Sequence, residues 1–390
     1  MKNCKINLFF ILLINLFIFS SCNESEGNIL SYKLKGNDTL YICDISTIPN
    51  EIRNKKLSEL IDSFHFISFE DNDTALFKPW KVYISDHHIG ILQDAMSPFK
   101  LFDHTGKFLC DIGRIGQAEG EYTMLYSATI NEQDSAIWLT PLNGNKLLRY
   151  NMKGQFISSI NVRPMHKPVI RCESDNTLTA TNLYFKGMPG FLYLRVFPND
   201  SIYYSVSEKE YSFVPKDLNG NFIGYNHEIW FYNNTKAFTY MTTAFDTLYT
   251  YDISKDKTTS RFTVQPPINE SYYVIDETPS YFLINIYKTT GIKGKKLALA
   301  DKNSGKFLYT EVQNDFLGNL PVTNFSPSNG WYYEMFEPIE LIELIEEHLS
   351  KNNSSQEDKN ILNTILSNID DDGNNILFMG KLSKKIKAIF

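Results

Sequence analysis

The chain has 390 residues and a formal net charge of −7. This negative balance excludes nucleic-acid binding, which requires a concentrated basic patch to neutralise phosphates. Hydrophobic residues make up 43% and charged residues 21%, so most of the chain is expected to pack rather than stay disordered. Aromatic residues reach 14%, and their large flat side chains favour half-buried β-sheet surfaces.

The N-terminus has the layout of a signal peptide, predicted over residues 1–21. Lys2 and Lys5 precede a nearly pure apolar run at 6–19. A run of about 14 residues is too short to cross a bilayer as a helix, which takes roughly 20. The small residues that follow lead into Cys22 and resemble the lipobox of bacterial lipoproteins. We therefore predict cleavage just before Cys22 and attachment of lipid to it.

Residues 22–39 are predicted to form a tether between the lipid and the folded domain. The segment 23–27 is short and acidic, and it resembles a signal for transport to the cell surface in the Bacteroidetes. The alternative is a soluble spacer that keeps the domain clear of the membrane. We expect an outer membrane lipoprotein at the cell surface or on the periplasmic face, with the membrane as its partner through Cys22.

From residue 40 to the end, short apolar stretches alternate with turn residues about every ten positions, which indicates antiparallel strands. The order of strands repeats after about forty residues. The first unit comprises residues 81–84, 89–92, 99–102 and 107–112; the second comprises 136–139, 146–150 and 155–162. Repeats of about forty residues with four strands each predict the blades of a β-propeller.

The two units also share one turn. The segment Phe102–Phe108 aligns with Tyr150–Phe156, and a glycine closes each turn at Gly106 and Gly154. Glycine adopts positive φ without steric cost, which a tight turn between strands often requires. Weaker copies of the pattern follow at 247–252 and 297–307.

The chain resembles the six-bladed β-propeller lipoproteins of the Bacteroidetes, which are related in style to NHL-repeat propellers. Four segments carry the resemblance: 101–108, the glycine-containing loop 112–122, the lead-in 57–63 and the segment 370–377. In the loop, Ala118-Glu119 replaces the family's usual Gly-Pro. The resemblance implies six blades, and about 50 residues per blade agree with that number.

A helical insertion is expected at 337–369. Leu341 and Ile345 recur at helical spacing, as do Leu362 and Ile369 after a polar break. We predict an all-β fold, a six-bladed propeller over residues 40–390 with this small insertion in its last blade. A strand at 64–69 would pair beside 376–382, so that the ring closes without an exposed sheet edge.

Two motifs could bind a metal, and for both a structural interpretation is preferred. Asn368–Gly373 fits the opening of a calcium loop, but Met379 stands where the twelfth-position Glu is required, so a helix stop and turn are expected. His87 and His88 are adjacent, and neighbouring residues of a strand face opposite sides of the sheet. The sequence therefore predicts no metal ligand.

Two further motifs could carry chemistry. The loop 113–116 lacks the Lys-Ser/Thr ending and the helix of a phosphate-binding loop. Glu119 and Glu121 lie close together, but nothing separates their pKa values, so a solvated or turn-stabilising role is expected. Cys43, Cys110 and Cys172 are expected to be buried single thiols. No catalytic or cofactor-binding residue is predicted.

Two functions remain open. The first is a monomeric, lipid-anchored binding or scaffold module for a glycan, peptide or partner protein. The second is a lyase or hydrolase with its active site at the central channel, since six-bladed propellers host both and fold does not decide function. Several His, Asp, Glu or Arg side chains meeting at the channel would favour catalysis, whereas an aromatic, uncharged cleft would favour binding.

Overall fold

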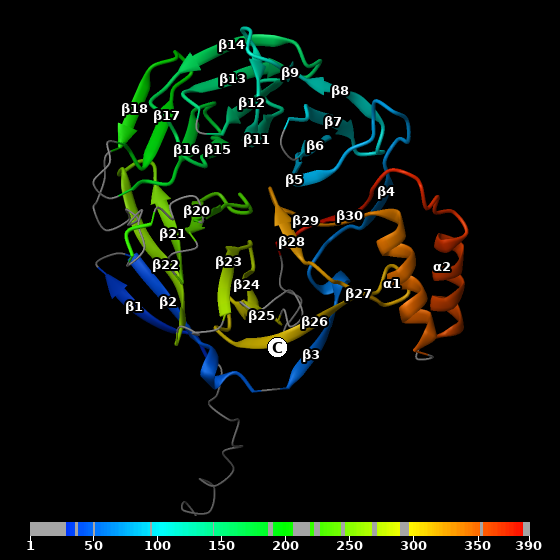
Figure 1. Ribbon diagram of the computed structural model, residues 1–390. Helices are drawn as coiled ribbons and strands as arrows, with labels where there is room; N and C mark the ends of the chain where they lie inside the picture. Colours follow the sequence, from blue (N-terminus) through cyan, green and yellow to red (C-terminus); the bar gives the residue numbers. More distant parts are fainter. Residues whose placement is uncertain are drawn as a thin grey trace, which may run out of the picture.

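The computed structural model describes residues 29–35, 38–49, 51–93, 96–142, 144–185, 190–205, 219–221, 227–242, 246–266, 271–288, 296–351 and 354–384. Six antiparallel sheets follow one another around a ring (Figure 1). The predicted six-bladed β-propeller is therefore confirmed. In each blade the first strand faces the centre of the ring; the fourth lies at the outer edge in blades 1, 2, 3 and 6, whereas further strands lie outside it in blades 4 and 5.

The blades follow the order of the chain, except that the last one takes its outer strand from the N-terminal part. Blade 1 contains β5 (Pro79–Ile84), β6 (His88–Gln93), β7 (Phe99–Asp103) and β8 (Phe108–Ile112). Blade 2 contains β11 (Leu125–Asn131), β12 (Ala136–Pro141), β13 (Lys146–Asn151) and β14 (Phe156–Asn161). Blade 3 contains β15 (Val169–Cys172), β16 (Leu178–Thr181), β17 (Tyr193–Val196) and β18 (Ile202–Ser205).

The second half of the ring has strands of more uneven length, from two residues in β19 to nine in β22. Blade 4 contains β19 (Ile229–Trp230), β20 (Phe238–Thr242), β21 (Thr247–Asp252) and β22 (Lys257–Gln265). Blade 5 contains β23 (Ser271–Glu277), β24 (Tyr281–Lys288), β25 (Lys296–Asp301) and β26 (Phe307–Asn314). Blade 6 contains β28 (Ser326–Ser328), β29 (Trp331–Phe336), β30 (Ile376–Lys381) and β4 (His65–Ser68).

The strand β4 closes the ring. It precedes blade 1 in the sequence but pairs antiparallel with β30, with Ser68 opposite Ile376 and His65 opposite Met379. The predicted closure is therefore confirmed, and the outer edge of β30 is covered by a strand.

The first strands of the chain extend two blades, which the sequence did not predict. Strand β1 (Ser31–Lys35) pairs with β2 (Asp38–Asp44), and β2 runs parallel to β22. Strand β3 (Ile52–Lys56) runs parallel to β26. Because β1 lies within residues 22–39, regular structure extends into the stretch assigned to the tether. The remaining short elements are η1 (Ile45–Thr47), η2 (Leu57–Glu59), β9 (Arg114–Ile115), β10 (Glu121–Tyr122) and β27 (Leu320–Pro321).

The hydrophobic core lies between neighbouring blades. Between blades 1 and 2, Leu101 and Ile112 pack with Ile130, Ile137 and Tyr150, and all five are buried. Corresponding clusters lie between the other neighbouring blades. Because a blade is covered on both faces, side chains on both sides of its strands are buried, as β11 shows by being buried along its whole length.

The shared turn performs the same task in blades 1 and 2. Gly106 has φ 86° and Gly154 has φ 77°. A Cβ atom on Gly106 would lie 2.3 Å from the Ser68 carbonyl oxygen, and one on Gly154 would lie 2.1 Å from the Asp111 carbonyl oxygen. Each glycine thus closes its turn and lets the neighbouring blade approach.

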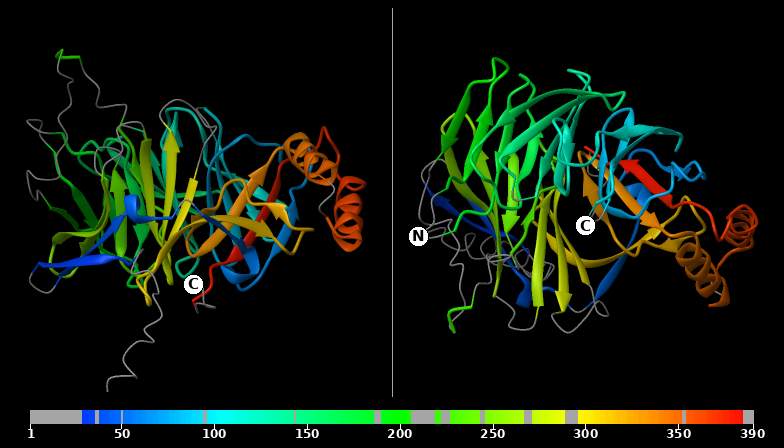
Figure 2. Two further views of the ribbon diagram at one scale, coloured as in Figure 1. Left: turned by 90° about the horizontal axis from the view of Figure 1, so that it is seen from below. Right: turned by 45° about the horizontal axis from the view of Figure 1, so that its top comes forward.

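The predicted insertion forms two helices between β29 and β30, α1 (Pro338–Ser350) and α2 (Gln356–Leu366). They project from the rim of the ring in all three ribbon views (Figures 1 and 2). Leu341 and Ile345 of α1 and Leu362 of α2 are fully buried, and they pack with Phe378 of β30. No helix of the described residues is long and apolar enough to span a membrane.

Candidate functional site

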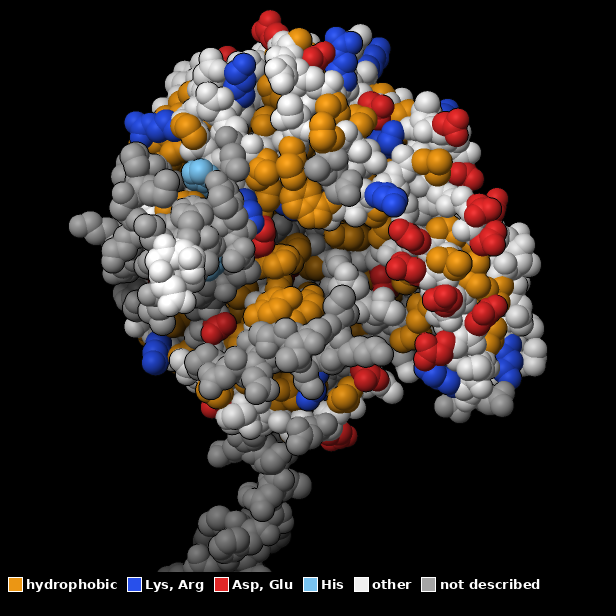
Figure 3. Space-filling view, viewed as in Figure 1, with side chains coloured by type: hydrophobic (Ala, Val, Ile, Leu, Met, Phe, Trp, Pro, Cys, Tyr) orange, Lys and Arg blue, Asp and Glu red, His pale blue; other side chains and the backbone are white. Residues whose placement is uncertain are grey.

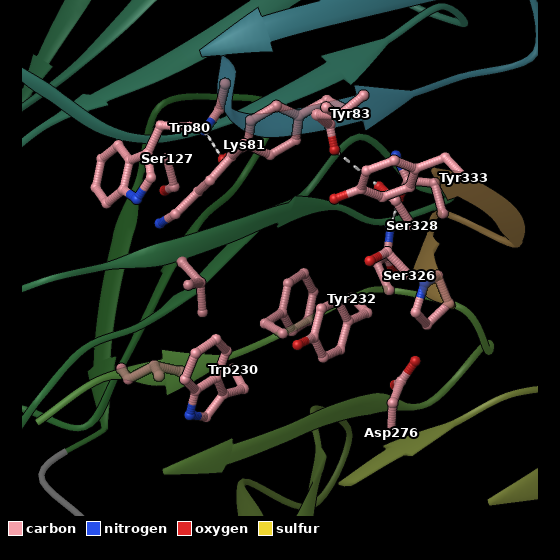
Figure 4. Close-up of a pocket in the computed structure, with 18 of the residues that line it drawn as sticks. Trp80, Lys81, Tyr83, Ser127, Trp230, Tyr232, Asp276, Ser326, Ser328 and Tyr333 are labelled. Carbon is pink, nitrogen blue, oxygen red and sulfur yellow. Dashed lines mark hydrogen bonds between the residues drawn. The ribbon is translucent and has the colours of Figure 1, made fainter. Parts of the chain in front are cut away.

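A cavity of about 300 Å³ lies at the centre of the ring, lined from all six blades (Figure 4). We call it the aromatic cavity. In the space-filling view, apolar side chains gather around the hollow at the centre of the face (Figure 3). Its aromatic lining comprises Trp80, Tyr83, Trp230, Phe231, Tyr232, Tyr287, Phe325 and Tyr333. Ring closure alone brings these residues together, since they come from blades 1, 4, 5 and 6.

Among the described residues of this lining, two are charged, Lys81 and Asp276. Lys81 projects from β5 and Asp276 from β23, and they lie on opposite sides of the cavity (Figure 4). They therefore do not form an acid–base pair.

Lys81 lies against aromatic rings. Its Nζ donates a hydrogen bond to the Tyr126 carbonyl oxygen at 2.8 Å. It also lies 4.3 Å from the ring centroid of Trp80 and 3.8 Å from that of Tyr126, close enough for cation–π attraction. Burial lowers the pKa of Lys81 to about 7, because removal from water disfavours the ammonium form, although Glu228 acts in the opposite direction.

Asp276 sits on the other wall in a buried network. Its carboxylate accepts hydrogen bonds from Asn234 Nδ2 and, at 2.8 Å, from the Glu277 backbone N–H. Burial raises the pKa of Asp276 well above its ordinary value, and the charge of Glu277 adds to the effect. Burial therefore favours the uncharged form of this carboxyl group relative to a carboxyl group in water.

The phenols of the cavity are neutral. Burial raises the pKa of Tyr333 and of Tyr287 to about 12, and it raises that of Tyr232 well above its ordinary value. The Tyr83 hydroxyl accepts a hydrogen bond from the Ala128 N–H at 3.1 Å. The walls thus offer apolar ring faces and a few uncharged polar groups.

Two buried polar atoms of the lining have no hydrogen-bond partner within the described part of the chain. They are Nε1 of Trp230, a donor, and Oδ1 of Asn285, an acceptor. Unpaired buried polar atoms are costly, so such atoms in a cavity are available to a ligand or to ordered water.

The cavity has a floor made by two loops. Asn233 follows β19 and Asn329 lies in the β28–β29 turn, and Asn233 Nδ2 donates to Asn329 Oδ1. The Asn329 N–H donates to the Tyr232 carbonyl oxygen at 2.8 Å. Both asparagines also line a second cavity of about 320 Å³ beyond them. The loops from blades 4 and 6 therefore separate the central channel into two hollows.

The second hollow, which we call the polar cavity, is lined by Ser85, Glu132, Glu173 and Trp331 among others. Glu132 Oε1 accepts hydrogen bonds from Ser85 Oγ at 2.6 Å and from the His87 N–H at 2.8 Å, and it lies 2.9 Å from His88 Nδ1. The two histidines meet at this carboxylate because His87 lies in the turn that precedes β6.

The motifs considered in the sequence lie outside the aromatic cavity. Glu121 accepts a hydrogen bond from the Ala118 N–H at 2.9 Å and pairs with Arg114 Nε at 2.7 Å. The turn-stabilising role of Glu121 is thus confirmed, within the loop between blades 1 and 2. Asp370 and Gly373 form a turn through a 3.1 Å backbone hydrogen bond, as expected.

The burial expected for the three cysteines is confirmed for Cys43 and wrong for Cys110 and Cys172. Cys43, Cys110 and Cys172 are free thiols, with Cys43 buried and the other two half-buried. Cys22, the predicted lipid site, lies outside the described residues. No group of three or more His, Cys, Asp or Glu residues within the described ranges could hold a metal ion.

The residues that define the cavity were not singled out from the sequence. Lys81 and Asp276 occupy ordinary strand positions; Lys81 has apolar neighbours on both sides, whereas Asp276 is followed by the charged Glu277. The available signal was a charged residue within an otherwise buried strand. That signal becomes specific only when the strand is known to face the channel.

The fold and the cavity define a six-bladed β-propeller with a central pocket lined from all six blades. The chain belongs to the family described as "Domain of unknown function (DUF4934)", whose model matches residues 40–381. No curated protein matches the chain.

A solved structure shares the fold. A protein of Bacteroides fragilis described as exported is 16% identical, with 86% of this chain and 98% of that chain covered and a TM-score of 0.61. A member of the DUF4221 family from Bacteroides vulgatus is 9% identical, with 83% and 98% covered and a TM-score of 0.46. An auxiliary nutrient binding protein from Bacteroides ovatus is 6% identical, with 63% and 64% covered and a TM-score of 0.39.

Proposed function

We propose that the protein is a non-enzymatic binding module that takes a small ligand into the aromatic cavity. The proposal depends on the lining of the cavity. Neutral aromatic rings surround the space, and Lys81 and Asp276 lie on opposite walls. Mostly apolar cavities with a few placed polar groups are typical of binding sites. An enzyme would require nucleophile, acid or base groups that converge on one point.

Trp80 is the best residue for a test, because it is 41% exposed and lines the cavity. Saccharides and short peptides would be screened by thermal shift and by quenching of tryptophan fluorescence. We expect Trp80→Ala to weaken the binding of any hit about tenfold, since stacking on one ring contributes on the order of 1 kcal/mol.

Leu109→Ala is the matched control. Leu109 is also 41% exposed but lies on β8, at the outer edge of blade 1. The control should bind as the wild type does. Binding that is unchanged in both Trp80→Ala and Trp230→Ala would place the ligand elsewhere and overturn the proposal.

We also propose that lipid on Cys22 holds the mature protein, as a monomer, on the outer membrane at the cell surface or its periplasmic face. Support comes from the apolar run and the small residues before Cys22. Cys22→Ser should abolish incorporation of a labelled fatty acid and release the protein from membranes. Cys4→Ser, within the predicted signal peptide, is the control and should leave both unchanged.

A further inference from the structure

Lys81 brings positive charge to the aromatic cavity without an acidic partner of its own. Its Nζ makes one hydrogen bond, to the Tyr126 carbonyl oxygen at 2.8 Å, and otherwise faces the rings of Trp80 and Tyr126. No carboxylate in the described ranges lies within ion-pair distance of it. A sheltered ammonium in that position gains strongly from an anion.

Glu228, the acid whose charge acts on Lys81, already has other partners. One carboxylate oxygen of Glu228 pairs with Lys167 Nζ and the other accepts the hydrogen bond of the Tyr126 hydroxyl. Lys167 also donates to the His227 carbonyl oxygen at 2.9 Å. Glu228 therefore already has two partners, and its charge acts on Lys81 only from beyond ion-pair distance.

The rest of the lining does not cancel the charge of Lys81. Asp276 lies on the far wall, where burial raises the pKa of its carboxyl group well above the ordinary value. Trp80 lies next to Lys81 and leaves 41% of its surface exposed. The cavity thus places a cation beside a flat apolar face, and its volume of about 300 Å³ is at the small end of ligand sites, which run from about 300 to 1,000 Å³.

We infer that the ligand of this cavity is a small ring-bearing molecule with one carboxylate, whose acidic group pairs with Lys81 while its ring lies against Trp80. Uronic acids and aromatic carboxylic acids share this chemistry. The inference rests on the proposed function and adds the charge of the ligand to it.

Proton uptake should accompany binding. The charged and titratable groups around the amine are Glu228, Lys167, Tyr126 and His227, and burial lowers the pKa of Lys81 to about 7. A bound carboxylate stabilises the ammonium form and raises that pKa. Affinity should therefore be highest below pH 7 and fall about tenfold per pH unit above it, until the pKa of the complex is reached.

The experiment compares acids with their neutral partners by titration calorimetry of the purified protein at pH 6 and pH 8.5. The pairs are glucuronic acid with glucose, benzoate with benzamide, and indole acetate with indole acetamide. We expect the acid of at least one pair to bind at least tenfold more tightly than its partner at pH 6. Lys81→Met should remove that preference, whereas Lys81→Arg should keep it and remove the fall in affinity at pH 8.5.

Lys107→Met, in the exposed turn of blade 1, is the control and should behave as the wild type. If neutral members bind as well as or better than acids, or if the acid preference survives in Lys81→Met, the inference is overturned while the proposed function stands. If none of the six compounds binds, or if their binding does not depend on Trp80, the inference is overturned, and the proposed function is decided separately by Trp80→Ala and Trp230→Ala on the hits of the wider screen.

Discussion

The two hollows of the central channel differ in how their charges are paired. They have similar volumes, about 300 and 320 Å³, and they share Asn233 and Asn329. In the polar cavity Glu132 is paired with His88, and Glu173 is paired with Arg171. In the aromatic cavity Lys81 has no carboxylate partner among the described residues.

The fold provides the two hollows, and the side chains decide whether a charge in each hollow is paired. Closing six blades into a ring creates a hollow at both ends of the channel. A charge that is already paired has little to gain from a ligand, whereas a sheltered, unpaired charge gains a great deal. The aromatic cavity is therefore the better binding site of the two, although the same strands build both.

The largest expected effect comes from opening the ring, which removes both cavities together. Deleting residues 60–70 removes β4 and leaves the edge of β30 uncovered. We expect the cooperative unfolding transition to disappear, because blade 6 would lose its outer strand and its packing with blade 1. Thermal unfolding followed by circular dichroism checks this result.

Deleting residues 31–35 is the control. This segment is β1, an exposed edge strand that pairs with β2. The control should unfold cooperatively with only a small decrease in Tm. A cooperative transition in both deletion variants would mean that the blades fold without closure of the ring by β4. Ring closure would then not be what forms the two cavities.

Lys81→Met tests the cost of the unpaired charge. Because the pKa of Lys81 is about 7 in the folded protein and 10.5 without burial, the unfolded chain binds more protons between these values. The wild type should therefore gain stability as the pH rises from 7 to 10.5. At pH 7 the variant should be more stable by about 2–4 kcal/mol, and the difference should shrink at pH 9.5. Urea unfolding at both values measures it.

Glu132→Gln tests the paired charge and should change stability in the opposite direction. The amide cannot replace the charge-assisted contacts with His88, and one of its polar atoms is a donor where Ser85 and His87 also donate. We expect a loss of about 1 kcal/mol at pH 7. A stabilised Glu132→Gln variant would show that the two cavities do not differ as described.

The contrast between local and distant pairing explains how much of the fold could be predicted. The turns at Gly106 and Gly154 depend on neighbouring residues, so the sequence shows them directly. The closure by β4 followed from the need to cover an edge. By contrast, β2 and β3 run parallel to β22 and β26, which are more than 200 positions away, and no local periodicity identifies such partners.

The candidate site was less predictable for a related reason. Trp80, Lys81 and Tyr83 read as one ordinary strand, and aromatic residues fill both cores and cavities. Which side chains face the channel depends on the position of the strand in its blade and on the closed ring. Glu119 and Glu121 were candidates because they are close in sequence. Lys81 and Asp276 are far apart in sequence, and they line one cavity only because blades 1 and 5 belong to the same ring.

The smallest expected effect concerns the histidines beside the polar cavity. His104 Nε2 lies 3.0 Å from the Ser85 carbonyl oxygen, and its ring packs edge-on against Trp331 at 5.3 Å. Burial lowers the pKa of His104, and nearby His65 and His87 add to the effect. The unfolded chain therefore binds the proton more readily. The stability contributed by neutral His104 is complete above its ordinary pKa of about 6.5 and is lost as the pH falls through the lower folded value.

We expect the wild type to lose less than about 1 kcal/mol through this group between pH 7 and pH 5, because solvent screens a half-buried ring. His104→Gln should lose less stability than the wild type over that range, and His348→Gln on the outer helix α1 should follow the wild type. Urea unfolding at pH 7, 6 and 5 compares the three proteins. An identical pH profile for His104→Gln and the wild type would show that the polar cavity tolerates the extra proton.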